Sequence, residues 1–112
     1  MGVNTQFYEW YKMMVILTNR CNLTCKMCDI ITHPKTGITR EMAFQAADFA
    51  EKHHFSEFEI GGGEATLVPY FWEYLDRVCR MPASIRLVTN GVKTTPEQVQ
   101  TLAGYPNLQV QI

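Results

Sequence analysis

Three cysteines stand close together in the sequence, at Cys21, Cys25 and Cys28. Their spacing is C-x3-C-x2-C, so the thiolates can converge on one metal ion or cluster, because each side chain needs only a few bonds of reach. Thiolates suit soft metals, which here means zinc or an iron–sulfur cluster. The first residues, MGVNTQFYEW, have no basic segment followed by an apolar stretch, so we expect no signal peptide. In a chain that stays in a reducing compartment, clustered cysteines more often bind metal than form disulfides.

A fourth ligand decides between the two metals. A structural zinc site needs four closed ligands, and the candidates are Cys79 and His33. The pattern around Cys79 places it on the apolar face of a helix, where a cysteine acts as a small buried hydrophobe. His33 precedes a proline in a loop, which is typical of an exposed histidine. Without a fourth ligand, a cubane cluster would have one iron open to a cofactor or substrate.

Two further motifs are rich in glycine. Gly61–Glu64 has the sequence GGGE, and Thr66 takes the last glycine position of a dinucleotide-binding G-x-G-x-x-G pattern. The P-loop lysine is missing too, and Glu64 would repel a pyrophosphate. A carboxylate beside small residues is instead suited to an ammonium group. The other motif, Thr89–Gly91, ends in Asn-Gly, which by itself is a common turn.

The elements that must position these motifs alternate between strands and helices. Apolar stretches predict strands at residues 11–17, 55–60, 85–89 and 108–112. Thr39 is a good N-cap for a helix that runs to residue 52, and Thr95 opens a capping box for a helix that Gly104 ends. Pro69 is expected in the first turn of the helix between them.

Apolar residues at helical spacing predict which helix faces are buried. The predicted faces are Met42, Ala46, Phe49 and Ala50 in the first helix, and Phe71, Tyr74, Leu75, Val78 and Cys79 in the second. Strands that alternate with helices indicate an α/β fold with a parallel sheet. Loops that follow the strands of such a sheet share one edge, so we expect the cysteines, GGGE and TNG to meet there.

Composition narrows the function classes. The chain has 112 residues with 10 Lys and Arg against 11 Asp and Glu, a formal net charge of −1. Such a balance argues against a partner nucleic acid held by bulk charge. The longest apolar run, Met13 to Leu17, falls far short of the ~20 residues that span a bilayer. We therefore expect a cytoplasmic chain without a membrane partner.

Together the three motifs resemble those of the radical S-adenosylmethionine (SAM) superfamily. Cys21–Cys28 has that family's C-x3-C-x2-C spacing after the first strand, Gly62–Glu64 matches its GGE motif after the second, and Thr89–Gly91 resembles the TNG often seen after the third. Their order and separation also agree. One departure is Ala65, which stands where the family usually has a proline.

The resemblance implies a 4Fe-4S cluster and S-adenosyl-L-methionine as cofactors. Three irons would be bound by Cys21, Cys25 and Cys28, and the fourth would be chelated by the methionine amine and carboxylate of SAM. A reductant outside the chain, similar to flavodoxin or ferredoxin, would supply one electron. Reductive cleavage would then give a 5′-deoxyadenosyl radical that abstracts a hydrogen from the substrate.

The resemblance also implies the residues around SAM. Gly62, Gly63 and Glu64 would hold the methionine amine, with Glu64 as its counter-charge. Met27 would lie near the adenine and Asn90 near the ribose. No side chain is assigned as catalytic, because the cofactor carries the chemistry.

The implied fold is a partial (β/α)6 TIM-like barrel, of which residues 1–112 would supply the first three βα units and a fourth strand. Residues 1–112 would then be the N-terminal portion of an incomplete core domain, inactive alone. The alternatives are a zinc-binding structural module and a simple electron-transfer iron–sulfur protein with the same cysteines. The electron-transfer protein would need a fourth ligand and has no use for Gly62–Glu64.

Overall fold

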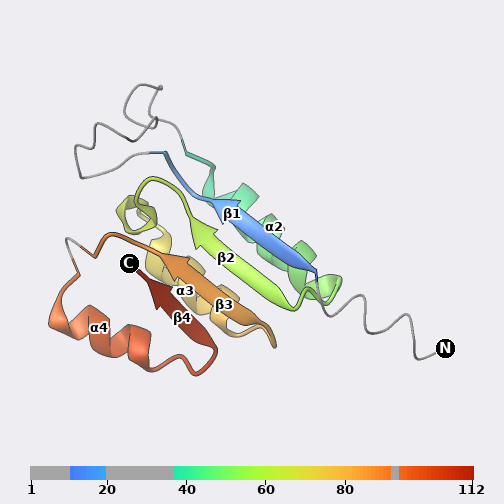
Figure 1. Cartoon of the computed structure of the whole chain (residues 1–112). Helices are drawn as coiled ribbons and strands as arrows, with labels where there is room; N and C mark the ends of the chain where they lie inside the picture. Colours follow the sequence, from blue (N-terminus) through green and yellow to red (C-terminus); the bar gives the residue numbers. More distant parts are fainter. Residues whose placement is uncertain (1–10, 20–36, 92–93) are drawn as a thin grey trace.

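The structure, a computed structural model, describes residues 11–19, 37–91 and 94–112. Its strands form one sheet in the order β1-β2-β3-β4, and each neighbouring pair is parallel. All four arrowheads point toward the same edge in Figure 1. The strand bounds are β1 Lys12–Ile16, β2 Glu57–Gly61, β3 Ser84–Val88 and β4 Leu108–Gln111. The predicted strands and their parallel arrangement are confirmed.

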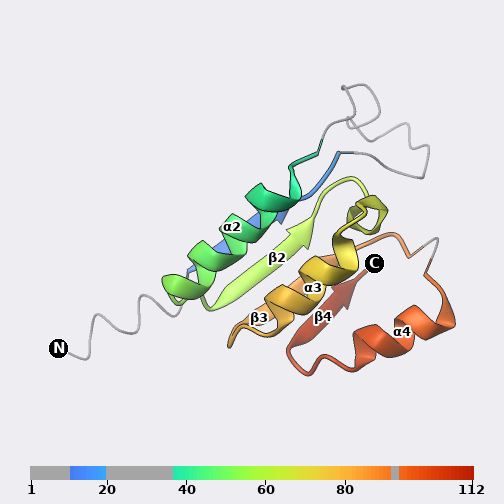
Figure 2. The same ribbon diagram turned by 180° about the vertical axis from the view of Figure 1, so that it is seen from behind.

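The helices connect successive strands. Figure 2 shows α2 and α3 against one face of the sheet, with α4 on the side of β4, whereas Figure 1 shows the other face open. Their bounds are α2 Arg40–Lys52, α3 Phe71–Cys79 and α4 Pro96–Ala103, and a short 3-10 helix, η2, spans Ala65–Leu67. Sequential neighbours that all run the same way wind in one direction, as in a barrel, whereas a doubly wound sheet reverses its order. The expected α/β, barrel-like architecture is confirmed.

The core lies between the sheet and its helices. Because side chains alternate along a strand, every second row of the register faces α2 and α3. One such row pairs Met13 with Phe58 and Ile85 with Leu108, and the next pairs Val15 with Ile60 and Leu87 with Val110. The buried side chains of α3 are Phe71, Tyr74, Leu75 and Val78. The predicted apolar face of α3 is therefore confirmed, with Cys79 half-buried at its end.

The buried face of α2 is as predicted at Ala50 and in part at Ala46, which packs against the core, but the prediction is wrong for Met42 and Phe49. Its buried residues are Ala43, Ala47 and Ala50, while Met42 and Phe49 are 55% and 51% exposed. Alanines at this spacing form a smooth stripe that lets the helix lie close to the sheet, and the larger side chains then remain at its sides. The predicted N-cap is correct, because the amide of Met42 donates to Thr39 Oγ1 at 3.1 Å.

The chain enters α3 differently from the prediction. Tyr70 is the N-cap, so Pro69 precedes the helix and does not occupy its first turn. The reason is η2, which uses residues 65–67, after which the amide of Phe71 donates to the carbonyl of Val68. The capping box of α4 is present as predicted, with Thr95 and Gln98 each accepting from the backbone amide of the other.

Charged side chains cross the open face of the sheet. Glu59 lies between Lys12 and Arg86, at 3.1 Å from Lys12 Nζ and 3.8 Å from Arg86. The two cations cover the carboxylate, which leaves Glu59 only 9% exposed. As for membranes, no helix in the described ranges has both the length and the apolar run needed to span one.

Candidate functional site

The end of β1 is tied closely to the end of β2. Leu17, fully buried, donates its amide to the carbonyl of Gly61 at 3.1 Å. The carbonyl of Thr18 then accepts a hydrogen bond from the amide of Gly63 at 2.7 Å. Thr18 also forms an antiparallel bridge with Gly37. Residues 19 and 37, where the chain leaves the sheet and comes back to it, therefore both lie at the carboxyl end of β1.

The glycine turn after β2 fits around this point. Gly62 has φ +139°, and a Cβ there would lie 2.3 Å from the carbonyl oxygen of Thr18. Only glycine tolerates both the backbone conformation and the contact. The sequence predicted that small residues would allow a ligand close to this backbone. In the described structure, the group that lies against Gly62 is the backbone of Thr18.

Glu64 is the most unusual residue of the site, because its carboxylate is fully buried. Oε1 accepts a hydrogen bond from the amide of Asn90 at 2.7 Å. Oε2 accepts from the amide of Thr66 at 3.1 Å, from the hydroxyl of Thr89 at 2.6 Å and from the hydroxyl of Thr66. Glu64 is also the N-cap of η2, which explains its bond to the Thr66 amide.

The charge of Glu64 is stable in this setting. Burial by itself raises the pKa of a carboxyl group, because it removes water from the anion. Here the hydrogen bonds from Thr66, Thr89 and Asn90 outweigh burial, and the pKa of Glu64 is lowered below its ordinary value. The site therefore contains a buried negative charge at neutral pH.

The turn after β3 completes the arrangement. The hydroxyl of Thr89, which donates to Glu64, also accepts a hydrogen bond from the amide of Gly91 at 3.2 Å. Gly91 has φ +71°, a conformation that favours glycine. The amide of Thr89 donates to the carbonyl of Gln111 in β4 at 3.0 Å. Thr89 thus connects the TNG turn to β4 and to the loop after β2.

The structure brings together one part of the predicted site. Gly62, Gly63, Glu64 and Asn90 meet at the carboxyl edge of the sheet, as the sequence predicted. The three motif cysteines and Met27 lie outside the described residues, as does His33. Sequence reasoning missed three threonines, Thr18, Thr66 and Thr89, as partners of the glycine turn and its glutamate. A signal was available in the sequence, because Thr89 lies within the TNG motif and Thr66 lies two residues after GGGE.

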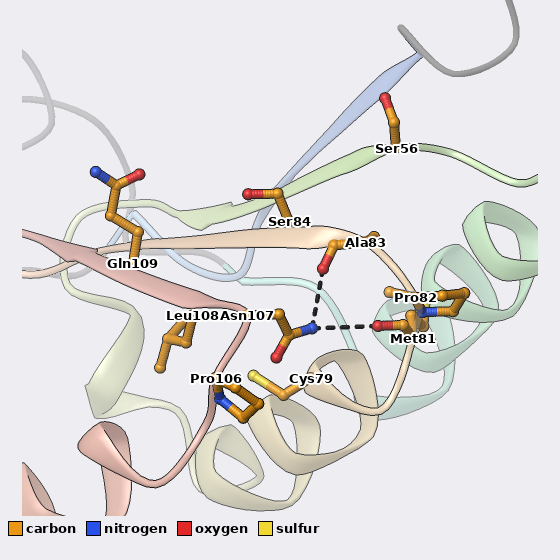
Figure 3. Close-up of a pocket in the computed structure, with 10 residues that line it drawn as sticks. All are labelled: Ser56, Cys79, Met81, Pro82, Ala83, Ser84, Pro106, Asn107, Leu108 and Gln109. Carbon is orange, nitrogen blue, oxygen red and sulfur yellow. Dashed lines mark hydrogen bonds between the residues drawn. The ribbon is translucent and has the colours of Figure 1, made fainter.

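Cys79 lies at the opposite edge of the sheet. Its side chain lines an open cavity of about 760 Å³ near the amino ends of β3 and β4. Figure 3 shows the lining residues, among which Asn107 donates to the carbonyls of Met81 and Ala83. Burial raises the pKa of the Cys79 thiol to about 12, so it stays protonated. Within the described ranges, no three His, Cys, Asp or Glu side chains gather as metal ligands.

The family of the chain follows from comparison with known proteins. Residues 15–112 match the model of the radical SAM superfamily. This chain belongs to that superfamily, as its motifs predicted, and the superfamily uses a 4Fe-4S cluster and SAM. The superfamily includes enzymes such as the maturase described next, which agrees with the expected class.

Among its relatives is the mycofactocin maturase MftC of Mycobacterium tuberculosis, 33% identical over 98 residues, which are 86% of this chain and 25% of MftC. Another is the antilisterial bacteriocin subtilosin biosynthesis protein AlbA of Bacillus subtilis, 32% identical over 91 residues, or 80% of this chain and 20% of AlbA. The chain therefore spans about a quarter or less of the length of these relatives.

A solved structure has the same fold. SuiB of Streptococcus suis, in its crystal structure with the precursor peptide SuiA, superposes with a TM-score of 0.76 at 14% identity. The likeness covers 96% of this chain and 26% of SuiB. SuiB has also been crystallised with S-adenosylmethionine. At this identity the likeness supports the fold, which agrees with a partial TIM-like barrel.

Proposed function

We propose that residues 1–112 form the N-terminal portion of a radical SAM core domain, in which Cys21, Cys25 and Cys28 hold a 4Fe-4S cluster. The observation that carries the proposal is that the end of β1 and the turns after β2 and β3 meet at one edge of the sheet. Thr18, which leads toward the cysteines, is bonded to Gly63, and Glu64 of the same turn is bonded to Asn90.

The residues present fit the two cofactors. Three thiolates at this spacing are a suitable donor set for an iron–sulfur cluster. The buried charge of Glu64 lies in the same turn as Gly62 and Gly63. This turn is bonded to Thr18, from which the chain leads to the cysteines. A negative charge in a site of low dielectric constant attracts the ammonium group of the SAM methionine. Asn90 and Met27 are the proposed contacts for the ribose and the adenine.

The chain's own task is to bind and orient. Cys21, Cys25 and Cys28 would hold the cluster, and Gly62–Glu64 would hold the methionine end of SAM. With an external reductant similar to flavodoxin or ferredoxin, the bound cofactors would supply one-electron reductive cleavage of SAM to methionine and a 5′-deoxyadenosyl radical, which would take a hydrogen atom from the substrate. Gly62–Glu64 places the methionine end of SAM, and the strand ends shield it from water. We propose a cytoplasmic location, where cysteine thiolates remain reduced.

A peptide is the proposed substrate class. The support is that relatives are named as a maturase and a bacteriocin biosynthesis protein, and that SuiB binds a precursor peptide. A test is to incubate the reconstituted full-length protein with short peptides encoded beside its gene. Mass spectrometry would detect the change in peptide mass that accompanies the loss of hydrogen from a true substrate.

The central experiment is anaerobic reconstitution of the full-length protein with iron and sulfide. We expect a brown protein with about four irons and four sulfides per chain, and formation of 5′-deoxyadenosine from SAM under dithionite. A colourless protein that binds zinc instead would support the structural module. A cluster without SAM cleavage would support the electron-transfer protein.

A further inference from the structure

The carboxylate of Glu64 joins two loops through hydrogen bonds from backbone amides, whose N–H direction is fixed. Oε2 faces the amide of Thr66 in its own loop, and Oε1 faces the amide of Asn90 in the loop after β3, at 2.7 Å. A backbone amide has a fixed N–H direction, whereas a hydroxyl can rotate to donate or accept. Each oxygen of the carboxylate is therefore required as an acceptor.

Burial separates this carboxylate from any ligand. Glu64 is 0% exposed and Thr89, which covers Oε2 from the β3 side, is 7% exposed. Oε2 accepts from the Thr66 amide and from both threonine hydroxyls, so an ammonium that approached this oxygen would have to displace a partner. The attraction between Glu64 and a SAM amine is thus exerted through space, while its hydrogen bonds hold the protein itself.

We propose that Glu64 is a positioning residue that acts through Thr89 and Asn90. Its carboxylate holds the turn after β3 against the glycine turn after β2, and this fixes the wall of the SAM site that carries Asn90. Thr89 is part of the same device, because its hydroxyl donates to Glu64 and accepts from Gly91. This inference rests on the proposed function, in which the edge of the sheet binds SAM.

Glu64→Gln is the sharpest variant because of the two fixed amides. An amide side chain has one oxygen and one NH2 group, so in either orientation the NH2 faces a backbone N–H. Glu64→Gln should therefore weaken SAM binding about as much as Glu64→Ala, roughly 5- to 150-fold. If Glu64 instead accepted directly from the SAM amine, the retained oxygen of Glu64→Gln would preserve part of the affinity.

Two threonines offer a matched pair. Thr89→Val removes the hydroxyl donor to Oε2 from the loop after β3, whereas Thr66→Val removes a hydroxyl donor to the same Oε2 from Glu64's own loop. Positioning through the β3 loop predicts that Thr89→Val weakens SAM binding at least about 5-fold and that Thr66→Val has a much smaller effect. Thr89→Ser, which keeps the hydroxyl, should bind like the parent. In the Glu64→Gln background, Thr89→Val should add little, because the connection is already lost.

The experiment uses the full-length protein in two forms. SAM affinity is measured by equilibrium binding to the reconstituted protein, and hydrogen exchange at the Asn90 amide is measured without cluster or SAM. We expect faster Asn90 exchange in Glu64→Gln and Thr89→Val, with no change at core amides such as Leu87. If Glu64→Gln does not fold, Thr89→Val carries the same test, because it leaves the charge and both amides in place.

Distinct results overturn the two proposals. A parent protein that does not bind SAM contradicts the proposed function, and Asn90 exchange then still reports on the connection between the loops. Unchanged Asn90 exchange in both variants contradicts the positioning role. So does a Thr89→Val variant that binds SAM like the parent while Glu64→Gln retains more affinity than Glu64→Ala.

Discussion

The amide of Gly63 donates a hydrogen bond of 2.7 Å to the carbonyl of Thr18, which joins the glycine turn after β2 to the chain leading from β1 toward the cysteines. The approach is so close that Gly62 has no room for a side chain on the Thr18 side. The glycines of this motif thus allow the turn after β2 to pack against the end of β1. Their proposed part in binding SAM comes in addition to this packing.

Adjacent glycines give the first prediction. Gly62→Ala should destabilise the fold by more than the ~1–3 kcal/mol of backbone strain, because its Cβ would also clash with the Thr18 carbonyl at 2.3 Å. Gly61→Ala is the control, since its Cβ would meet only Ile16 Cδ1 at an ordinary 3.6 Å. Urea unfolding of both variants checks this, and equal stabilities would contradict it.

The second prediction concerns the cysteines. Alanine at Cys21, Cys25 or Cys28 should each abolish the 4Fe-4S cluster after anaerobic reconstitution, whereas Cys79→Ala should retain it. Cys79 lies at the amino edge of the sheet as a protonated thiol, away from the end of β1. Iron and sulfide content, with circular dichroism as a check of folding, measures the outcome. Loss of the cluster in a folded Cys79→Ala variant would show that Cys79 is a ligand.

Acid should weaken the fold through Glu64. Folding lowers the pKa of this carboxyl, so the ion stabilises the folded state fully above its ordinary pKa of about 4.3. The stabilisation is lost as the pH falls through the lower pKa of the folded state. The parent should therefore be more stable than Glu64→Gln at pH 7, and the difference should shrink below about pH 4.3.

This comparison isolates Glu64 from other acids. Glu73 also has a lowered pKa, mainly through its hydrogen bond with Arg40, but it is present in both proteins and cancels in the difference. Urea midpoints at several pH values provide the measurement. A difference between parent and Glu64→Gln that stays constant down to pH 3 would argue against a stabilising buried anion.

The fourth prediction is a stabilising substitution. Tyr74 is fully buried among Phe44, Phe58 and Tyr70, and its hydroxyl has no hydrogen-bond partner in the described part of the chain. A buried hydroxyl without a partner costs free energy, and the ring packs equally well without it. Tyr74→Phe should raise the free energy of unfolding by about 1 kcal/mol. Thermal unfolding is the measurement, with Tyr70→Phe as a comparison that loses the bond to the carbonyl of Ile38. A lower melting temperature for Tyr74→Phe would show that the hydroxyl has a partner.

Much of the fold could be predicted because its signals are local. Thr39 and Thr95 cap helices that the residues after them predict. The alternation of strands and helices predicts a parallel sheet. The buried face of α2 could not be read in the same way. Met42 and Phe49 look more suitable for a core than Ala43 and Ala47, and only the distance between helix and sheet decides in favour of the alanines.

Motif spacing and strand polarity are properties of the chain, so the superfamily, the parallel sheet and the edge at which Gly62, Glu64 and Asn90 meet could all be predicted from the residues. The residue types also pointed to Glu64 as a partner for an ammonium group, because a carboxylate beside small residues suits one. Only the tertiary structure shows that this carboxylate accepts hydrogen bonds from Thr66, Thr89 and Asn90. Glu64 and Asn90 are 26 positions apart, and only the pairing of β2 with β3 brings a second fixed amide to the carboxylate and removes water from around it.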